Sequence, residues 1–296
     1  MRIALAGSSG LIGTALADSL RGDGHDVVRL VRRPAERPDE VRWDPSTGRI
    51  DADSLGVIDA AVNLCGAGVG DARWTATYRR VLHDSRVDPS RTLSVAMARM
   101  EPRPRVLLNA SGIGAYGDTG ERPADESAPL GDTFLAALVR DWEAATAPAS
   151  DAGIRVVRLR TGLVVASGGG AFGKLWPLAK LGVLGRLGSG KQWWSWIALE
   201  DHIAAMRFLI QRDDLSGPVN VVSPTPARNA DVTKAIARAV HRPAVMMVPS
   251  RAVKLVLGGF AEELLVSQRV VPAALQQAGF PWKHTDIDSA AQAYAP

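Results

Sequence analysis

Three glycines at a spacing of three residues follow a short apolar run at the start of the chain. Residues 2–6 read Arg-Ile-Ala-Leu-Ala, and Gly7, Gly10 and Gly13 come next. In a strand that turns directly into a helix, Gly7 permits the tight turn, Gly10 leaves room for a diphosphate, and Gly13 lets the helix lie close to the strand. The first helical turn then offers free N–H groups to an anion. The pattern predicts a dinucleotide site with contacts at Gly7, Ser9, Gly10, Leu11, Ile12 and Gly13.

The residues that follow the next expected strand, 26–31, indicate which dinucleotide is bound. A carboxylate at this place accepts a hydrogen bond from the ribose 2′-hydroxyl of NAD(H). The chain has Arg32 and Arg33 there and no acid. A guanidinium can hold a 2′-phosphate with two hydrogen bonds, whereas a carboxylate would repel it. We therefore expect NADP(H) to be preferred over NAD(H); the alternative is that both arginines are ordinary surface residues.

Short apolar runs alternate with helical stretches along most of the chain. The expected strands are 2–6, 26–31, 60–64, 105–110, 154–160, 219–222 and 244–248. The expected helices are 11–22, 75–99, 132–152, 199–211 and 229–240. Most strand runs are apolar without interruption, which indicates burial on both faces, as in a parallel sheet covered by helices. The order of the elements predicts a doubly wound α/β fold over residues 1–225, followed by a smaller, mainly helical segment, 226–296, on the substrate side.

Composition excludes several classes of protein. The chain of 296 residues has one cysteine, Cys65, and five scattered histidines, so neither an internal disulfide nor a structural zinc site of the Cys/His type is expected. No apolar run reaches the ~18 residues of a membrane span, and no leader precedes the first strand. The net charge of +4 is spread thinly, without a basic run for nucleic acid. We expect a cytoplasmic monomer or homodimer that takes a small molecule, with no metal, membrane or nucleic-acid partner.

Further segments resemble the extended short-chain dehydrogenase/reductases, the NAD-dependent epimerase/dehydratase group. Residues 63–68, Asn-Leu-Cys-Gly-Ala-Gly, resemble the segment that passes beneath the cofactor. Residues 111–117 resemble a Ser-rich segment ending in Tyr-Gly, and residues 159–164 resemble the strand whose exit lies near the nicotinamide. The resemblance implies a Rossmann fold. It adds the cofactor contacts Cys65, Gly66, Ala67, Ser111, Arg160 and Gly162.

Three segments resemble an atypical, epimerase-like subgroup of that family. They are residues 188–197, residues 217–224 and residues 261–270, the last of which is similar to a C-terminal domain of unknown function. Together with the earlier segments they cover nearly the whole chain. The resemblance implies an epimerase-like protein, but fold-level analogy does not fix a reaction.

The family's catalytic pair, Tyr-x-x-x-Lys, is missing from the matching helix. If Glu143 fixes the register, Leu135 takes the tyrosine position and Val139 takes the lysine position. The lysine normally lowers the tyrosine pKa so that the phenol can exchange a proton at neutral pH. Tyr116, with Ser111 beside it, is then the candidate proton donor. The alternative is that these two residues only fix their loop.

Aromatic and basic residues near the glycine-rich stretch 185–190 suggest a substrate pocket. Large flat side chains can line such a pocket, and the expected ones are Trp193, Trp194 and Trp196, with Trp74 and Trp176 as additions. The alternative is core packing. Lys191 and Arg186 are candidates to bind an anionic group of the substrate, and Arg86 is a candidate to reach into the cofactor cleft. We expect Cys65 to be a packing residue and Asp201 to cap a helix.

Two functions remain open at this point. The first is an NADP(H)-dependent oxidoreductase or isomerase that acts on a small carbonyl or hydroxyl compound. The second is a non-catalytic NADP(H)-binding sensor or interaction protein, which the missing Tyr-x-x-x-Lys pair favours. Consumption of NADPH with a carbonyl panel would distinguish the first from the second.

Overall fold

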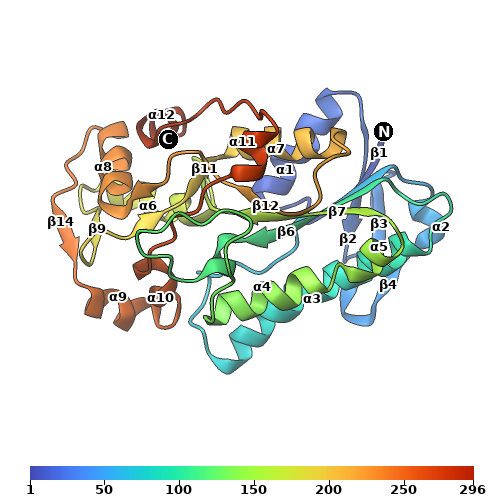
Figure 1. Cartoon of the computed structure of the whole chain (residues 1–296), viewed down its shortest axis with the longest axis horizontal. Coiled ribbons are helices and arrows are strands. Elements are labelled where there is room, and N and C mark those ends of the chain that lie inside the picture. The colour runs from blue at the N-terminus through green and yellow to red at the C-terminus, as the bar shows by residue number, and fades with distance from the viewer.

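A sheet of eight strands forms the centre of the computed structural model, which describes residues 1–296 apart from the side chain of Leu257. The strand order is β12-β7-β6-β5-β1-β2-β3-β4 (Figure 1). All neighbours are parallel except β3 and β4, which are antiparallel. The strands are β1 (Arg2–Ala6), β2 (Asp26–Val31), β3 (Glu40–Asp44), β4 (Arg49–Ile50), β5 (Ala60–Asn63), β6 (Val106–Gly112), β7 (Arg155–Thr161) and β12 (Gly217–Val221).

Helices cover both faces of this sheet, so the predicted doubly wound α/β fold is confirmed. Helices α1 (Leu11–Gly22) and α7 (Leu199–Gln211) lie on one face. Helices α3 (Ala76–Ala98), α4 (Phe134–Ala144) and α5 (Ala147–Asp151) lie on the other (Figure 1). Alternate residues of β1 enter the two cores, Ile3 and Leu5 on the α1 side and Ala4 and Ala6 on the α3 side. A strand that is buried on both faces must be apolar throughout, which explains the uninterrupted run.

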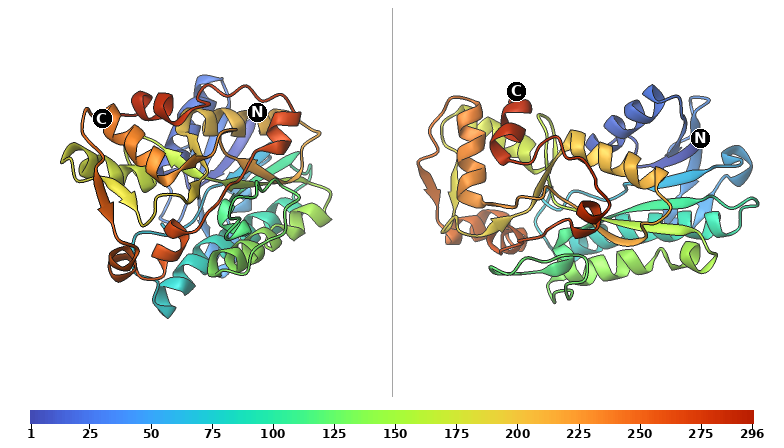
Figure 2. Two further views of the ribbon diagram at one scale, coloured as in Figure 1. Left: turned by 60° about the vertical axis from the view of Figure 1, so that its left-hand side comes forward. Right: turned by 45° about the horizontal axis from the view of Figure 1, so that its top comes forward.

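Three two-stranded sheets and several helices form a smaller lobe. The strand pairs are β8 (Leu163–Val165) with β11 (Trp196–Ala198), β10 (Trp193–Trp194) with β13 (Ala227–Arg228), and β9 (Gly185–Leu187) with β14 (Met246–Val248). The helices are α6 (Gly170–Lys180), α8 (Asn229–Ala239), α9 (Ser250–Leu257), α10 (Phe260–Leu265) and α12 (Ile287–Ala293). Figure 2 shows this lobe at the end of the molecule opposite to the N-terminal strands.

The C-terminal segment contributes to both parts of the molecule. Helix α11 (Ala273–Gln277) packs against β12, and its Leu275 lies in the same core as β1 and α1. Conversely, residues 163–198, from the first expected domain, belong to the smaller lobe. The division of the chain at residue 225 therefore stays a prediction, and the two lobes in space are not two continuous stretches of sequence.

Several sequence-based boundaries need correction. The single helix expected over 132–152 is two helices: α4 ends at Ala144 and α5 begins at Ala147, because Pro148 has no N–H with which to continue the hydrogen bonds of α4. The strand expected over 244–248 pairs with β9 and not with the central sheet. Elements that the sequence did not indicate include the short helices η1 (Pro45–Thr47), α2 (Ala52–Leu55) and η2 (Ile113–Tyr116). Within the described residues, no helix combines the length and the apolar character needed to cross a membrane.

Candidate functional site

The glycine turn after β1 has the close backbone approaches that its spacing predicts. Gly7 has a φ of +79°, and a Cβ there would lie 2.7 Å from the carbonyl carbon of Leu64 at the end of β5. A Cβ on Gly13 would lie 2.1 Å from the Gly7 carbonyl oxygen. A Cβ on Gly10 would meet only that oxygen, at 3.5 Å, so this side of the turn is open. The turn therefore brings the start of α1 against the ends of β1 and β5 and leaves its outer side accessible.

The N-terminus of α1 is open to an anion. Gly10 is the N-cap in extended conformation, no side chain caps this fully described helix, and its first turn carries no acidic residue. The first N–H groups of a helix lack partners within the helix and lie at the positive end of its dipole. Leu11 and Ile12 supply these groups here and are half-buried. This arrangement can bind a phosphate or diphosphate group.

The two arginines after β2 differ in their surroundings. The Arg33 guanidinium donates to both carboxylate oxygens of Glu40 on β3, at 2.8 and 2.7 Å, and these bonds are the main reason the pKa of Glu40 falls to about 2. Arg32 is exposed and has no hydrogen-bond partner in the described part of the chain; its charge acts on the Cys65 thiol. Arg32 is therefore the guanidinium that is free to bind an added phosphate, whereas Arg33 is already shared with Glu40. The partner Glu40 could not be predicted from the sequence.

The loop after β5 lies over a buried arginine. The Arg86 guanidinium, on α3, donates to the Ala67 carbonyl at 2.8 Å, and a Cβ on Gly66 would lie 3.1 Å from its Cζ. Burial lowers the Arg86 pKa to about 10, which leaves it charged at neutral pH. Burial also raises the Cys65 pKa to about 12, so Cys65 is a packed thiol and not a nucleophile. Arg86 thus supports this loop from beneath.

A buried polar network holds both hydroxyl groups that the sequence suggested for catalysis. The Ser111 hydroxyl donates to Glu143 at 2.6 Å, and Arg160 donates to both oxygens of Glu143 at 2.8 and 2.9 Å. Arg160 also donates to the Tyr116 hydroxyl at 3.0 Å, and that hydroxyl donates to Asn220 at 2.7 Å. Burial raises the Tyr116 pKa. The sequence identified Glu143 only as a register mark and missed Asn220.

The network changes the expectations for this part of the site. Ser111 and Tyr116 are buried, and each uses its hydroxyl proton within the protein. Arg160 and Gly162 also face the protein interior: a Cβ on Gly162 would lie 2.6 Å from the Ser195 carbonyl oxygen. The proton-donor role of Tyr116 stays a prediction.

The predicted tryptophan pocket is corrected by the structure. Trp194 and Trp196 are 6% and 0% exposed and lie in the core of the smaller lobe, as does Trp176. They reach this core from three elements, β10, β11 and α6. Trp193 faces outward, between the guanidinium groups of Arg228 and Arg269, whose Cζ atoms lie 3.8 and 4.7 Å from its ring centroid. Only Trp193 of the predicted three is placed to meet another molecule.

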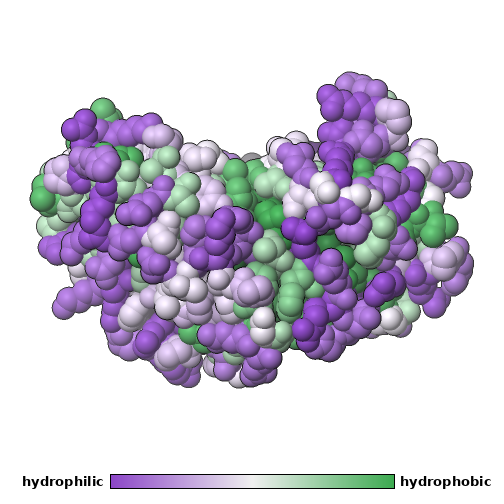
Figure 3. All heavy atoms as spheres, turned by 90° about the horizontal axis from the view of Figure 1, so that it is seen from above, coloured by the Kyte–Doolittle hydropathy of each residue, from purple (hydrophilic) through white to green (hydrophobic). Residues whose placement is uncertain are grey.

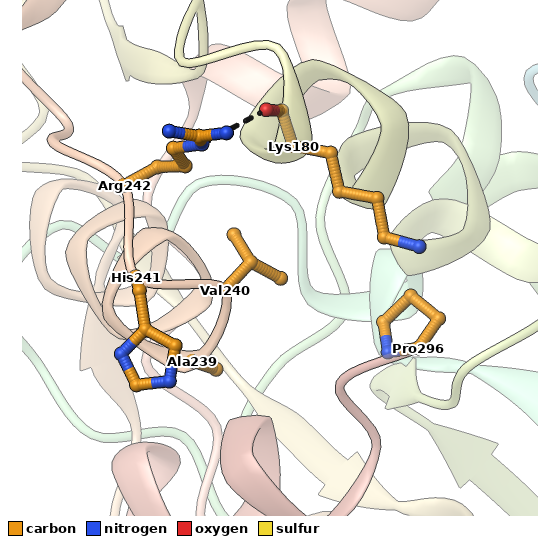
Figure 4. Close-up of a pocket in the computed structure, with 6 residues that line it drawn as sticks. All are labelled: Lys180, Ala239, Val240, His241, Arg242 and Pro296. Atoms are coloured by element: carbon orange, nitrogen blue, oxygen red, sulfur yellow. Dashed lines mark hydrogen bonds between the residues drawn. The ribbon is translucent and has the colours of Figure 1, made fainter.

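The remaining candidates lie apart from the glycine turn. Lys191 and Arg186 are exposed on the smaller lobe. Asp201 does not cap α7, because its carboxylate accepts from the backbone N–H groups of Lys283 and His284. An open surface hollow of about 410 Å³ includes none of the predicted site residues (Figure 4); it is lined by Lys180, Ala239, Val240, His241, Arg242 and Pro296. Seen from above, the molecule is indented between its two ends, and hydrophobic residues gather there (Figure 3).

Comparison with known proteins assigns the chain to a family. Residues 3–223 match the model of the NAD dependent epimerase/dehydratase family. The chain belongs to this family. Residues 248–294 of this family member also match a domain of unknown function, so the resemblance found in the sequence is confirmed for both segments.

Relatives match almost the whole length of the chain. An epimerase family protein of Mycobacterium leprae is 45% identical over 97% of this chain and 94% of its own. The human epimerase family protein SDR39U1 is 32% identical, with 98% of each chain covered. A crystal structure of human SDR39U1 with NADPH superposes with a TM-score of 0.92 at 31% identity, over 100% of this chain and 99% of that one. The crystal structure of a nucleoside-diphosphate sugar epimerase of Corynebacterium glutamicum superposes with a TM-score of 0.83 at 35% identity, over 100% of this chain and 58% of that one.

Proposed function

We propose that the chain is an NADP(H)-dependent oxidoreductase or isomerase that acts on a small carbonyl or hydroxyl compound. The observation that carries the proposal is the open N-terminus of α1 behind Gly7 and Gly13, with the unpaired Arg32 after the adjacent strand β2. The relative human SDR39U1, crystallised with NADPH, supports the choice of cofactor.

The residues around the turn suit NADP(H). The N–H groups of Leu11 and Ile12 would bind the diphosphate, and Arg32 would bind the 2′-phosphate. Arg86 would keep the loop at Gly66 and Ala67 in place beneath the dinucleotide. A reduced nicotinamide supplies a hydride to a carbonyl carbon, and the protein must position that carbon and provide the proton for the oxygen.

Calorimetric titration with NADPH and NADH tests the cofactor preference. Arg32→Ala should weaken NADPH binding by about 10- to 150-fold, because a hydrogen bond to a charged group contributes about 1.5–3 kcal/mol, and should leave NADH binding unchanged. Arg37→Ala is the matched control, since Arg37 is an exposed arginine of the same loop. A wild-type preference for NADH, or equal losses for both cofactors in Arg32→Ala, would contradict the proposal.

The second candidate function is a sensor that binds NADP(H) without turnover. It is favoured by Val139, which is buried in a core where the family has lysine, and by the engaged hydroxyls of Ser111 and Tyr116. Tight binding of NADPH with no consumption across a panel of aldehydes and ketones would support the sensor, and steady consumption would exclude it.

A further inference from the structure

Helix α10 of the C-terminal segment lies against the two loops that leave the central sheet at β5 and β6. Phe260 on α10 packs on Trp74 at 6.0 Å between ring centroids, and Trp74 packs on Phe134 of α4 at 5.2 Å. A Cβ on Gly70 would lie 2.9 Å from the Phe260 ring. The start of α4 lies against the segment that follows β6, since a Cβ on Gly114 would be 3.1 Å from the Leu135 side chain. Helix α10 therefore lies near the carboxyl end of β6.

One carboxyl group of α10 points to the start of α4. The Thr133 side chain, at the N-cap of α4, is close enough to Glu263 to act on its pKa, and the Gln268 amide approaches that carboxyl at 3.5 Å. Glu263 is half-buried, and no Lys, Arg or His among the described side chains forms an ion pair with it. A half-buried carboxyl without a cation, near the carboxyl end of a strand of the central sheet, is a candidate for a chemical role.

Burial also sets the protonation of this carboxyl. It raises the Glu263 pKa to about 7; the neighbouring Glu262 adds to the rise, and the Thr133 side chain partly offsets it. A general acid or base is most effective when its pKa lies near the working pH. The other charged groups around α10 are Arg73 and Arg79 beside its first turn, Lys254 on α9 and Asp132 before α4.

The position of Glu263 corresponds to the nicotinamide half of the crevice. A dinucleotide lies across the carboxyl ends of the strands, with its two halves on either side of the point where the strand order reverses. That point here lies between β1 and β5. Arg32, after β2, marks the adenosine side, so the nicotinamide side is that of β5 and β6, where α4 begins at Thr133.

We propose that the Glu263 carboxyl is the group that exchanges the substrate proton in this site, an inference that rests on the proposed function. In the reducing direction it gives its proton to the oxygen of a bound carbonyl group as the carbon receives the hydride, and the carboxylate then regains a proton from water. In the reverse direction the carboxylate takes the proton of a hydroxyl group. The C-terminal segment thus supplies what α4 lacks at Leu135 and Val139.

The pH dependence of cofactor binding tests this placement without a known substrate. The nicotinamide ring of NADP⁺ carries a positive charge that NADPH lacks, whereas their phosphates are the same. A carboxylate near the ring favours NADP⁺, so the ratio Kd(NADP⁺)/Kd(NADPH) should rise about fivefold or more as the pH falls from about 8 to about 5.5. Glu263→Gln should abolish this rise. Glu262→Gln is the matched control, because Glu262 is exposed on the same helix, and should retain it.

The outcomes separate the inference from the function on which it rests. A flat ratio in the wild-type protein, or a rise that persists in Glu263→Gln, overturns the role of Glu263 and leaves cofactor binding intact. Failure of the wild-type protein to bind either nucleotide overturns the proposed function itself. Thermal unfolding of each variant at the same pH values confirms that the ratios are measured on folded protein.

Discussion

At the scale of single residues, buried charges explain why two hydroxyl groups are engaged inside the protein. Arg160 and Glu143 form an ion pair whose side chains are 5% and 10% exposed, and Ser111 and Tyr116 complete its hydrogen bonds. An ion pair so far from water is stable only when both partners are present. The serine and the tyrosine therefore stabilise the pair.

Replacement of Glu143 by glutamine tests the importance of this pair. It leaves the Arg160 guanidinium buried without a counter-charge, so the free energy of unfolding should fall by about 3–5 kcal/mol. Chemical denaturation measures the change, and Asp141→Asn, at an exposed position of the same helix, is the control. A loss below about 1 kcal/mol would show that the pair is not important for stability.

Glu263 should make the stability of the protein depend on pH. Its folded pKa of about 7 lies above the ordinary value, so between about pH 4.5 and pH 7 the folded state binds more protons than the unfolded state. This contribution to stability is present in full at the acid end of that range and is lost as the pH rises through 7. Glu263→Gln should therefore show a smaller fall in Tm from pH 5 to pH 8 than the wild-type protein. An unchanged fall would contradict the raised pKa.

At the scale of elements, the strand–turn–helix unit at the N-terminus could be predicted almost entirely from the sequence. The bounds of β1, β2, α1 and α7 match the prediction, because buried apolar runs and glycines act locally. Strand β3 was missed because its Glu40 side chain is buried only through pairing with Arg29 and Arg33. Which of Trp193 and Trp194 points into the core could not be predicted either, since this depends on the pairing of β10 with β13, which is distant in the sequence.

Two glycines of α1 give a matched test of the turn. Gly13→Ala places a methyl group about where the Gly7 carbonyl oxygen lies, so α1 must shift; the protein should lose at least ~2 kcal/mol of stability and its NADPH binding. A Cβ on Gly22 meets nothing within 4 Å, so Gly22→Ala should stabilise the protein by about 0.5–1 kcal/mol and leave binding unchanged. Calorimetric titration and denaturation measure both effects. Normal binding by Gly13→Ala would contradict the role of the turn.

At the scale of the whole molecule, the C-terminal segment connects the two lobes. The Thr119 N–H donates to the Ser267 carbonyl, and the Arg269 N–H donates to the Thr119 hydroxyl. Ala124 forms a β-bridge with Val270. The guanidinium groups of Arg228 and Arg269 both lie over the Trp193 ring. The family resemblance identified this segment, but only the structure shows that it reaches the carboxyl edge of the sheet.

The stacked Trp193 should stabilise this connection. Each cation–π contact contributes about 0.5–1 kcal/mol at an exposed site, so Trp193→Ala should increase amide hydrogen exchange in residues 119–124 and 267–271 by about 5- to 30-fold. Trp193→Phe keeps an aromatic ring between the arginines and should show a much smaller increase. Equal exchange in wild-type protein and Trp193→Ala would show that the stacking does not hold the segment.

A crystal structure of the protein with NADPH would show whether the turn after β1 is the dinucleotide site. We expect the diphosphate against the N–H groups of Leu11 and Ile12, the 2′-phosphate bound by Arg32, and the nicotinamide on the side of β5 and β6. NADPH bound elsewhere, for example in the hollow beside His241 and Arg242, with the turn after Gly7 closed by its own side chains, would contradict it.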